Sequence, residues 1–162
     1  MRKMGNLKIL ESAFHVAQLT YAATRGFPTE ERFGLVSQMR RAAVSIGSNV
    51  AEGCGRSSER QFFNFLQIAA GSASELEFQA CLSIRLGIGS EAELLILIGA
   101  VHEVRRMLGA LCSRVAERLK ATREARLRAE KRGAKRRRAP KSEALRADAR
   151  PTRSVDYPYD PD

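Results

Sequence analysis

The sequence predicts an all-α protein, an up-down-up-down antiparallel four-helix bundle that ends in a disordered or partly helical basic C-terminal tail. None of the five prolines lies between residues 29 and 139, and proline is the strongest helix breaker. Ala, Leu, Glu and Arg, which are good helix formers, dominate that stretch. Apolar residues recur at three- and four-residue steps in four segments joined by short links, which is typical of helices packed in a bundle. We expect residues 6–119 to form the bundle and residues 120–162 to form a largely disordered tail.

The first helix is expected over residues 6–25, because Gly26 and Pro28 follow it as stop signals. Its apolar residues repeat at helical spacing and predict the face that turns toward the core. That predicted face consists of Leu7, Leu10, Phe14, Ala17 and Tyr21.

The second helix is expected to start at Thr29, a good N-cap residue, and to close at Gly53 and Gly55. Gly47 lies inside it and is expected to loosen or kink it, at a cost of about 1 kcal/mol relative to alanine. Its predicted apolar face consists of Phe33, Val36, Ala43, Ile46 and Val50.

The third helix is expected to open with the capping pair Ser58 and Gln61 and to end at Gly87 and Gly89. Residues 69–74 within it are all small, which allows close approach of another helix. The predicted main stripe consists of Phe62, Phe65, Leu66, Ala69, Ala73, Leu76 and Ala80.

The fourth helix begins with a second capping pair, Ser90 and Glu93, and its apolar stripe runs from Leu94 to Leu119. Residues 94–98 are apolar without a break. A helix that is apolar on all sides is buried on all sides, so this run indicates either a subunit interface or a locally thick core. The helix is expected to continue to about Gly133 and to be followed by disorder, since little apolar surface remains there to offset chain entropy.

Three sequence motifs occur in the order found in one known family. They are FPTEERFGLVSQMRRAAVSIGSNVAEGCGR (27–56), QFFNFLQIAAGSASELE (61–77) and LGIGSEAELLILIGAVHEVRRMLGAL (86–111). Together they resemble the four-helix-bundle proteins encoded in intervening sequences of bacterial 23S ribosomal RNA genes. That family is related in fold to the accessory variability protein of diversity-generating retroelements. The resemblance covers about residues 7–119, with Gly47 where relatives usually have Pro.

This resemblance implies a homopentameric ring or barrel of bundles without catalytic activity. In the retroelement branch, it implies a pentamer that binds nucleic acid and a partner reverse transcriptase. For the ribosomal-RNA branch it implies no defined biochemical role.

The residues themselves give little support for an enzyme. The two histidines, His15 and His102, fall on different predicted helices, and no catalytic motif, phosphate-binding loop or dinucleotide fingerprint is present. Cys54, Cys81 and Cys112 lack metal-site spacing and are expected to be buried small hydrophobes in a reducing cytoplasm. We therefore expect no cofactor, no metal and no enzymatic activity. The absence of a signal peptide and of a long apolar run also predicts a cytoplasmic protein without membrane contact.

The stretch 49–56 is the most motif-like part of the predicted bundle. Glu52 and Arg56 are spaced to pair across a helix end, and Gly53 or Gly55 is suited to the left-handed conformation that ends helices. One interpretation is a structural turn, and the other is a ligand or partner site at the end of the bundle.

Two arginine pairs, Arg40–Arg41 and Arg105–Arg106, fall in the middle of predicted helices. Each pair is either a solvated face or part of a groove that meets phosphate. In a pentamer such a patch would occur once in every subunit, and this repetition would raise the local potential felt by a polyanion.

The positive charge is concentrated near the C-terminus. Residues 1–119 hold 14 basic and 11 acidic side chains, whereas residues 120–153 hold 14 basic and 4 acidic ones. Such a segment releases counterions from a nucleic acid, and the lack of interleaved aromatic residues indicates sequence-independent backbone contact. The alternatives are a solubilising tail or an acidic membrane surface. The candidate contacts in this segment are Arg123, Arg126, Arg128, Lys131, Arg132, Lys135, Arg136, Arg137 and Arg138.

Two functions therefore follow from the sequence. The first is a non-enzymatic oligomer that binds RNA or DNA, with an accessory role to a retroelement reverse transcriptase as one form of it. The second is a protein-interaction scaffold of the 23S intervening-sequence type, in which contact with nucleic acid is incidental.

Overall fold

The computed structural model describes residues 8–138 and the side chains of residues 8–134, and within this range it contains helices and no strand. The prediction of an all-α four-helix bundle is confirmed. Contacts within the chain divide it into two units, Met1–Thr122 and Arg123–Asp162. The helices are α1 (Lys8–Ala23), α2 (Leu35–Gly55), α3 (Glu59–Arg85) and α4 (Glu91–Arg138), with the short 3-10 helices η2 (Thr24–Gly26) and η3 (Thr29–Arg32) between α1 and α2.

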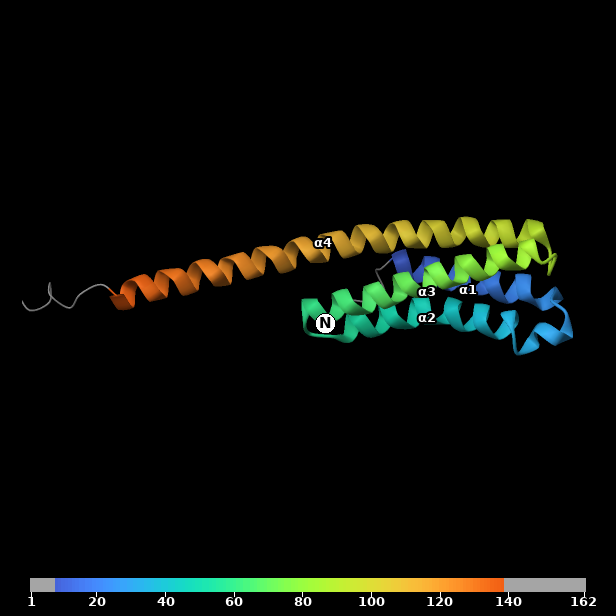
Figure 1. Ribbon diagram of the computed structural model, residues 1–162, viewed down its shortest axis with the longest axis horizontal. Helices are drawn as coiled ribbons and strands as arrows, with labels where there is room; N and C mark the ends of the chain where they lie inside the picture. The colour runs from blue at the N-terminus through green and yellow to red at the C-terminus, as the bar shows by residue number, and fades with distance from the viewer. Residues whose placement is uncertain (1–7, 139–162) are drawn as a thin grey trace, which may run out of the picture. The chain divides into compact units, whose positions relative to one another are not determined.

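In the first unit, α1, α2, α3 and the first part of α4 pack side by side, each antiparallel to the one before it (Figure 1). Their inward faces form one apolar core. The large residues of this core include Met39, Phe62, Leu66, Leu97 and Leu108, none of which is more than about 2% exposed. Burial of side chains of this size stabilises the fold by roughly 1.5–3 kcal/mol each.

The backbones of α2 and α3 lie close together along their shared face. Small side chains make this possible, and some of them are polar. The Oγ atoms of Ser45 and Ser72 lie 2.9 Å apart, and the Asn49 amide donates to Ser45 Oγ at 3.0 Å. Because these hydroxyl and amide groups have partners, the close contact does not leave them unsatisfied. The small run at residues 69–74 therefore has the packing role expected from the sequence.

The buried face of α1 differs from the predicted one. The core contains Ile9, Ala13, Val16, Thr20 and Ala23. The predicted residues lie beside this face, where Phe14 is 62% exposed and Tyr21 is 47% exposed, whereas Leu7 is outside the described residues. Both sets have helical spacing, and the close approach of α1 to α2 selects the smaller side chains. Leu10 and Ala17 are partly buried against the core, so the prediction was right for them and wrong for the large residues Phe14 and Tyr21.

The second helix starts later than predicted. Thr29 begins η3 (Thr29–Arg32), and α2 begins only at Leu35. The Glu31 carboxylate accepts a hydrogen bond from the Leu35 backbone N–H at 2.9 Å, so an acidic side chain satisfies a free N–H of the first turn. Phe33 lies between the two helices and is 86% exposed, so it does not belong to the predicted stripe. From Leu35 the helix continues without interruption through Gly47 to Gly55.

The turn between α2 and α3 contains the Glu52–Arg56 ion pair, and the Arg56 guanidinium lies 5.1 Å from the centroid of the Phe65 ring. Gly53 and Gly55 do not adopt the left-handed conformation, because the only positive φ angles in the described range are those of Gly87 and Gly89. Gly53 is instead required by close packing. A Cβ atom there would lie 2.9 Å from Phe65 Cβ.

Both serine caps form as the sequence indicates. Ser58 Oγ accepts from the Gln61 N–H, and Ser90 Oγ accepts from the Glu93 N–H, each at 3.5 Å. Between α3 and α4, Gly87 and Gly89 have φ angles of 67° and 80°. These are left-handed values that glycine adopts without steric cost.

The apolar run at the start of α4 is not buried within the chain. Leu94 and Leu97 face the core, whereas Leu95 is 55% exposed and Ile96 is 60% exposed. The thick-core interpretation is therefore wrong, and an apolar surface is left on α4.

The fourth helix extends past the predicted end at Gly133 and reaches Arg138. Ala, Lys and Arg after Gly133 favour helix, and Pro140 is the next residue in the sequence that prevents it. Residues 120–133 are helical as expected for the fourth helix, and residues 134–138 are helical where disorder was expected. The expected disorder beyond them falls on residues 139–162, which lie outside the described range.

Candidate nucleic-acid interface

The second unit is strongly basic in the part that the structure describes, residues 123–138. This segment contains nine basic and two acidic residues, and all of it is helical. Each described side chain from residue 123 to residue 134 is exposed, including Leu127 at 47%. A helix that is polar on all sides has no face to bury in a core, so these side chains are accessible to a ligand.

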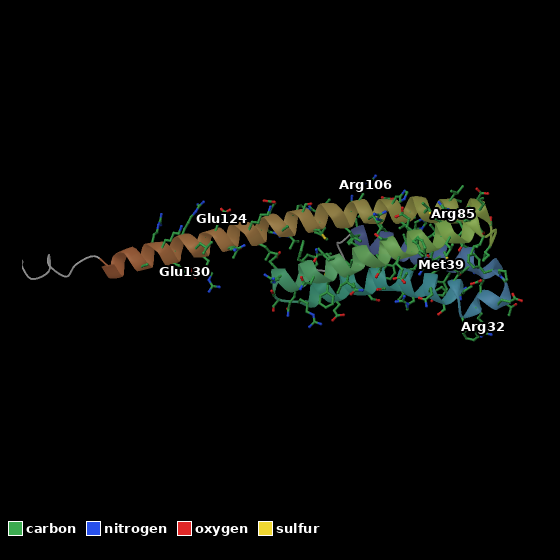
Figure 2. The ribbon with its side chains drawn as sticks, viewed as in Figure 1. Arg32, Met39, Arg85, Arg106, Glu124 and Glu130 are labelled. Atoms are coloured by element: carbon green, nitrogen blue, oxygen red, sulfur yellow. The ribbon has the colours of Figure 1, made fainter. Side chains whose placement is uncertain are left out.

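Two ion pairs support this helix from different sides. Glu124 and Glu130 project from different sides of α4 (Figure 2). Arg128 lies 3.6 Å from the Glu124 carboxylate, and Arg126 Nε lies 2.9 Å from Glu130 Oε1. Pairs four residues apart stabilise a helix by about 0.3–0.5 kcal/mol each. Both glutamates are therefore occupied by arginines of their own helix.

Three cations remain after this pairing. Within the described side chains, residues 8–134, Arg123, Lys131 and Arg132 have no ion-pair partner. All three are exposed, and they are the residues of this helix best placed to contact a phosphate. The side chains of the remaining candidates, Lys135, Arg136, Arg137 and Arg138, lie outside the described ones, although their backbone is helical.

The predicted pair Arg40–Arg41 is engaged in contacts within the bundle. Arg40 Nε donates to Thr24 Oγ1 at 2.9 Å, and its guanidinium lies 4.6 Å from the centroid of the Tyr21 ring. Arg41 pairs with Glu75 of α3 at 2.6 Å. These contacts orient both arginines toward neighbouring helices, which makes them poorer phosphate ligands than a free cation.

The two arginines of the second predicted pair, Arg105 and Arg106, have different surroundings. Arg105 pairs with Glu77 of α3, and His102 Nε2 lies 2.9 Å from the other oxygen of the same carboxylate. Arg106 is exposed on the outer side of α4 (Figure 2). The structure thus does not bring the four bundle arginines together in one basic patch.

Glu77 of α3 pairs with two side chains of α4, and its carboxyl stays ionised at lower pH than an ordinary glutamate does. The hydrogen bond with His102 lowers the pKa of Glu77, burial opposes this change, and the positive charge of Arg105 lowers the pKa further. The carboxylate therefore offsets positive charge at this position.

Replacement of Glu77 by glutamine is expected to reduce stability in a pH-dependent way. A carboxyl whose pKa is lowered on folding contributes stability above its unfolded pKa, and this contribution is lost as pH falls through the folded pKa. The stability difference between Glu77→Gln and the native chain should be largest near about pH 7 and should shrink as the pH falls below the ordinary pKa of a glutamate. Urea unfolding at several pH values measures it, and a constant difference would contradict the assignment.

A surface groove of about 600 Å³ lies between α3 and α4. It was not predicted, although the small residues on α3 and Gly109 on α4 are a signal for it. Burial raises the pKa of the Cys112 thiol at its edge, so that thiol is a weak nucleophile. The groove is lined by Gln67, Ala70, Ser74, His102, Arg105, Gly109 and Cys112.

The cysteines differ from one another in exposure. Cys54 is buried as predicted, whereas Cys112 is half-buried and Cys81 is exposed on α3, so the prediction of three buried cysteines was wrong. Among the described residues, no group of three or more His, Cys, Asp or Glu side chains is placed to hold a metal ion. No helix in the described range is long and apolar enough to cross a membrane.

These features define a class of protein, an all-α bundle followed by an exposed basic helix. The family model of the 23S rRNA-intervening sequence protein matches residues 5–110, and the chain belongs to this family. The basic helix at residues 123–138 lies outside the match. No curated protein matches the chain.

A crystal structure with the same fold comes from Bacteroides thetaiotaomicron VPI-5482, a protein with unknown function from the S23 ribosomal protein family. It is 23% identical to this chain, with a TM-score of 0.60, and the alignment covers 65% of this chain and 95% of the other. The share of this chain that is left uncovered is consistent with a bundle common to both proteins and an additional segment in this one.

Proposed function

We propose that the chain is a non-enzymatic, oligomeric protein that binds nucleic acid independently of sequence through the helix of residues 123–138. The single observation that supports this most is the unpaired charge on that helix. Arg123, Lys131 and Arg132 are exposed and have no carboxylate partner among the described side chains. Two of the predicted bundle arginines, Arg41 and Arg105, are instead held by Glu75 and Glu77. Accessible cations bind phosphates by releasing condensed counterions.

The lack of base-reading chemistry supports the sequence-independent part of the proposal. Between residues 120 and 153 the sequence contains no Phe, Tyr or Trp for stacking and no Asn or Gln for bidentate contacts with adenine. Lys and Arg contacts with the phosphate backbone position a protein without specifying a sequence.

A salt titration of binding tests the proposal. We compare the native chain with a triple variant, Arg123→Gln, Lys131→Gln and Arg132→Gln. The plot of the log of the binding constant for a duplex against log[salt] should become less steep by about 3 in this variant, since each lost phosphate contact removes about 0.9 from the steepness. The matched control replaces Arg25, Arg60 and Arg85, which are exposed on the bundle, by glutamine and changes the net charge equally. An equal loss of slope in both variants would contradict a localised interface.

Exposed apolar residues support the oligomeric part of the proposal. Leu95 and Ile96 on α4 and Phe78 on α3 are each more than half exposed. On the other pair of helices, an apolar groove of about 540 Å³ lies between α1 and α2 beside Phe14. Two different apolar surfaces on one subunit suit head-to-tail association, which closes into a ring when the rotation permits it. The homopentamer implied by the sequence resemblance is one such ring.

Light scattering tests this association. We expect the native chain to be oligomeric and the double variant Leu95→Asp, Ile96→Asp to be monomeric. Phe33→Asp serves as the control, because Phe33 is 86% exposed and lies outside both apolar surfaces. A monomeric native chain would contradict the oligomer.

A protein-interaction scaffold is the second candidate, and the same exposed apolar residues Phe78, Leu95 and Ile96 favour it. In that case a protein partner would contact the bundle, and an accessory role to a reverse transcriptase would be one example. Binding of a partner that is retained when the three cations of residues 123–138 are neutralised, together with the absence of nucleic-acid binding, would favour the scaffold.

A further inference from the structure

The basic residues of the helix of residues 123–138 surround its axis. An α-helix turns by about 100° per residue, so the position of each basic residue around the axis follows from the helical backbone. The widest gap between neighbouring basic positions is about 80°, between Arg136 and Arg126. A helix that packs on a core instead has an uncharged stripe of about 100° or more. This helix therefore has a basic position on every side.

Every side of this helix is also open to a ligand over its described side chains, all of which are exposed. Its two glutamates, Glu124 and Glu130, project from different sides of α4 (Figure 2), and each pairs with one arginine of the same helix. The cations without an ion-pair partner among the described side chains are spread in the same way. Lys131 lies about 80° and Arg132 about 180° from Arg123 around the axis. Unpaired positive charge thus occurs on more than one side.

One nucleic-acid segment cannot contact all of these cations. A phosphate backbone that lies along the helix contacts the side that faces it. Even the major groove of B-form DNA, which admits an α-helix, is only about 8.5 Å deep, whereas a helix with its side chains is about 10–12 Å across. The outer side of the helix stays out of the groove, and its cations can release counterions from a second segment in the same way.

We propose that the helix of residues 123–138 bridges two nucleic-acid segments, which it contacts on opposite sides. This inference rests on the proposed nucleic-acid binding and adds an activity to it, because the bound segments are brought close together. Contacts of Lys and Arg with phosphates carry no sequence information. The two segments therefore need no sequence in common and no complementarity to each other.

Capture of a second duplex by an immobilised one tests the bridging. A biotin-tagged DNA duplex is fixed to beads, and a fluorescent duplex of unrelated sequence is added with the full chain. We expect the beads to retain fluorescence only when the protein is present, and to lose it at high salt. Protein that is retained on the immobilised duplex without the second duplex would overturn the bridging but leave nucleic-acid binding in place. If no protein is retained, the proposed function itself is rejected.

An oligomer could also capture a second duplex, with each duplex on a different subunit. The experiment is therefore repeated with the double variant Leu95→Asp, Ile96→Asp, for which we expect a monomer with one basic helix. Its capture per bound protein should stay within about threefold of that of the native chain, well under a tenfold change. Loss of capture while the protein still binds the immobilised duplex would assign the bridging to the assembly and overturn it for the single helix.

Two variants with equal charge, both made in this double variant, test whether the sides of the helix matter. The one-sided variant keeps its basic positions within about 140° of the helix circumference. The distributed variant loses the same number of cations but keeps basic positions over about 240°. Both lose Arg128, so the release of Glu124 is the same in each. The one-sided variant is Arg128→Gln, Arg132→Gln, Lys135→Gln, Arg136→Gln, and the distributed variant is Arg123→Gln, Arg128→Gln, Arg136→Gln, Arg137→Gln.

The two variants are expected to differ in capture and not in simple binding. The one-sided variant should bind a single duplex at least as tightly as the distributed variant, because its remaining cations face the same way. It should capture the second duplex at least about tenfold less well, since few phosphate contacts remain for that duplex. Equal capture by the two variants, or a loss of capture that only follows a loss of single-duplex binding, would overturn the two-sided contact.

Discussion

A chain truncated after Thr122 is expected to lose its affinity for nucleic acid by at least about a hundredfold at physiological salt, because polyanion binding depends steeply on the number of phosphate contacts. The truncation removes the second unit and leaves residues 1–122 with a net charge of +4. Fluorescence anisotropy with a labelled duplex measures the affinity. If the affinity of the truncated chain stays within about threefold of that of the full chain, well under a tenfold change, the interface would have to lie on the bundle arginines.

Two controls make this truncation informative. The described core ends at Val115, so the shortened chain should keep its helicity and its unfolding temperature. A chain truncated after Arg138 retains the whole basic helix and removes residues 139–162, which contain four basic and five acidic residues. We expect this second truncation to bind as well as the full chain. Loss of binding in both truncations would place the contact beyond Arg138.

Replacement of Gly89 by alanine is expected to destabilise the bundle by roughly 2–4 kcal/mol, the combined cost of a left-handed backbone and of overpacking. Gly89 has a φ angle of 80°. A Cβ atom there would also lie 2.9 Å from Cδ1 of the Phe27 ring, which packs against the core. The turn between α3 and α4 is therefore constrained both by its own backbone and by the connection between α1 and α2. Chemical denaturation measures the change.

Gly87 supplies a matched control for this substitution. Its φ angle is 67°, but a Cβ atom there would meet nothing within 4 Å. Gly87→Ala should therefore show only the cost of the left-handed backbone, about 1–2 kcal/mol. The additional loss in Gly89→Ala should be relieved in a double variant with Phe27→Ala. Equal effects at Gly87 and Gly89 would show that contact with Phe27 does not matter.

The sequence predicts the helices well because their signals are local. Ser58 and Ser90 cap the third and fourth helices as their spacing indicates, and the stripe of α4 faces the core from Leu94 to Val115. The face of α1 was missed because two apolar rows occur at the same spacing. The choice between Ala13 and Phe14 depends on how closely α2 approaches, which is a property of the packed bundle.

The candidate interface was predicted only in part, and for a similar reason. Composition alone locates the basic segment after residue 119. It does not indicate that Arg41 and Arg105 pair with Glu75 and Glu77, because those pairs connect helices that are distant in sequence. Nor does it distinguish Arg126 and Arg128, which are paired, from Arg132.

Mapping of backbone amide chemical shifts on the full chain with a DNA duplex tests the central claim most directly. If the basic helix is the contact, the shifts should change from Arg123 to Arg138, and those of Arg40, Arg41 and Arg105 should not. Changes centred on the bundle arginines, with residues 123–138 unaffected, would contradict the account.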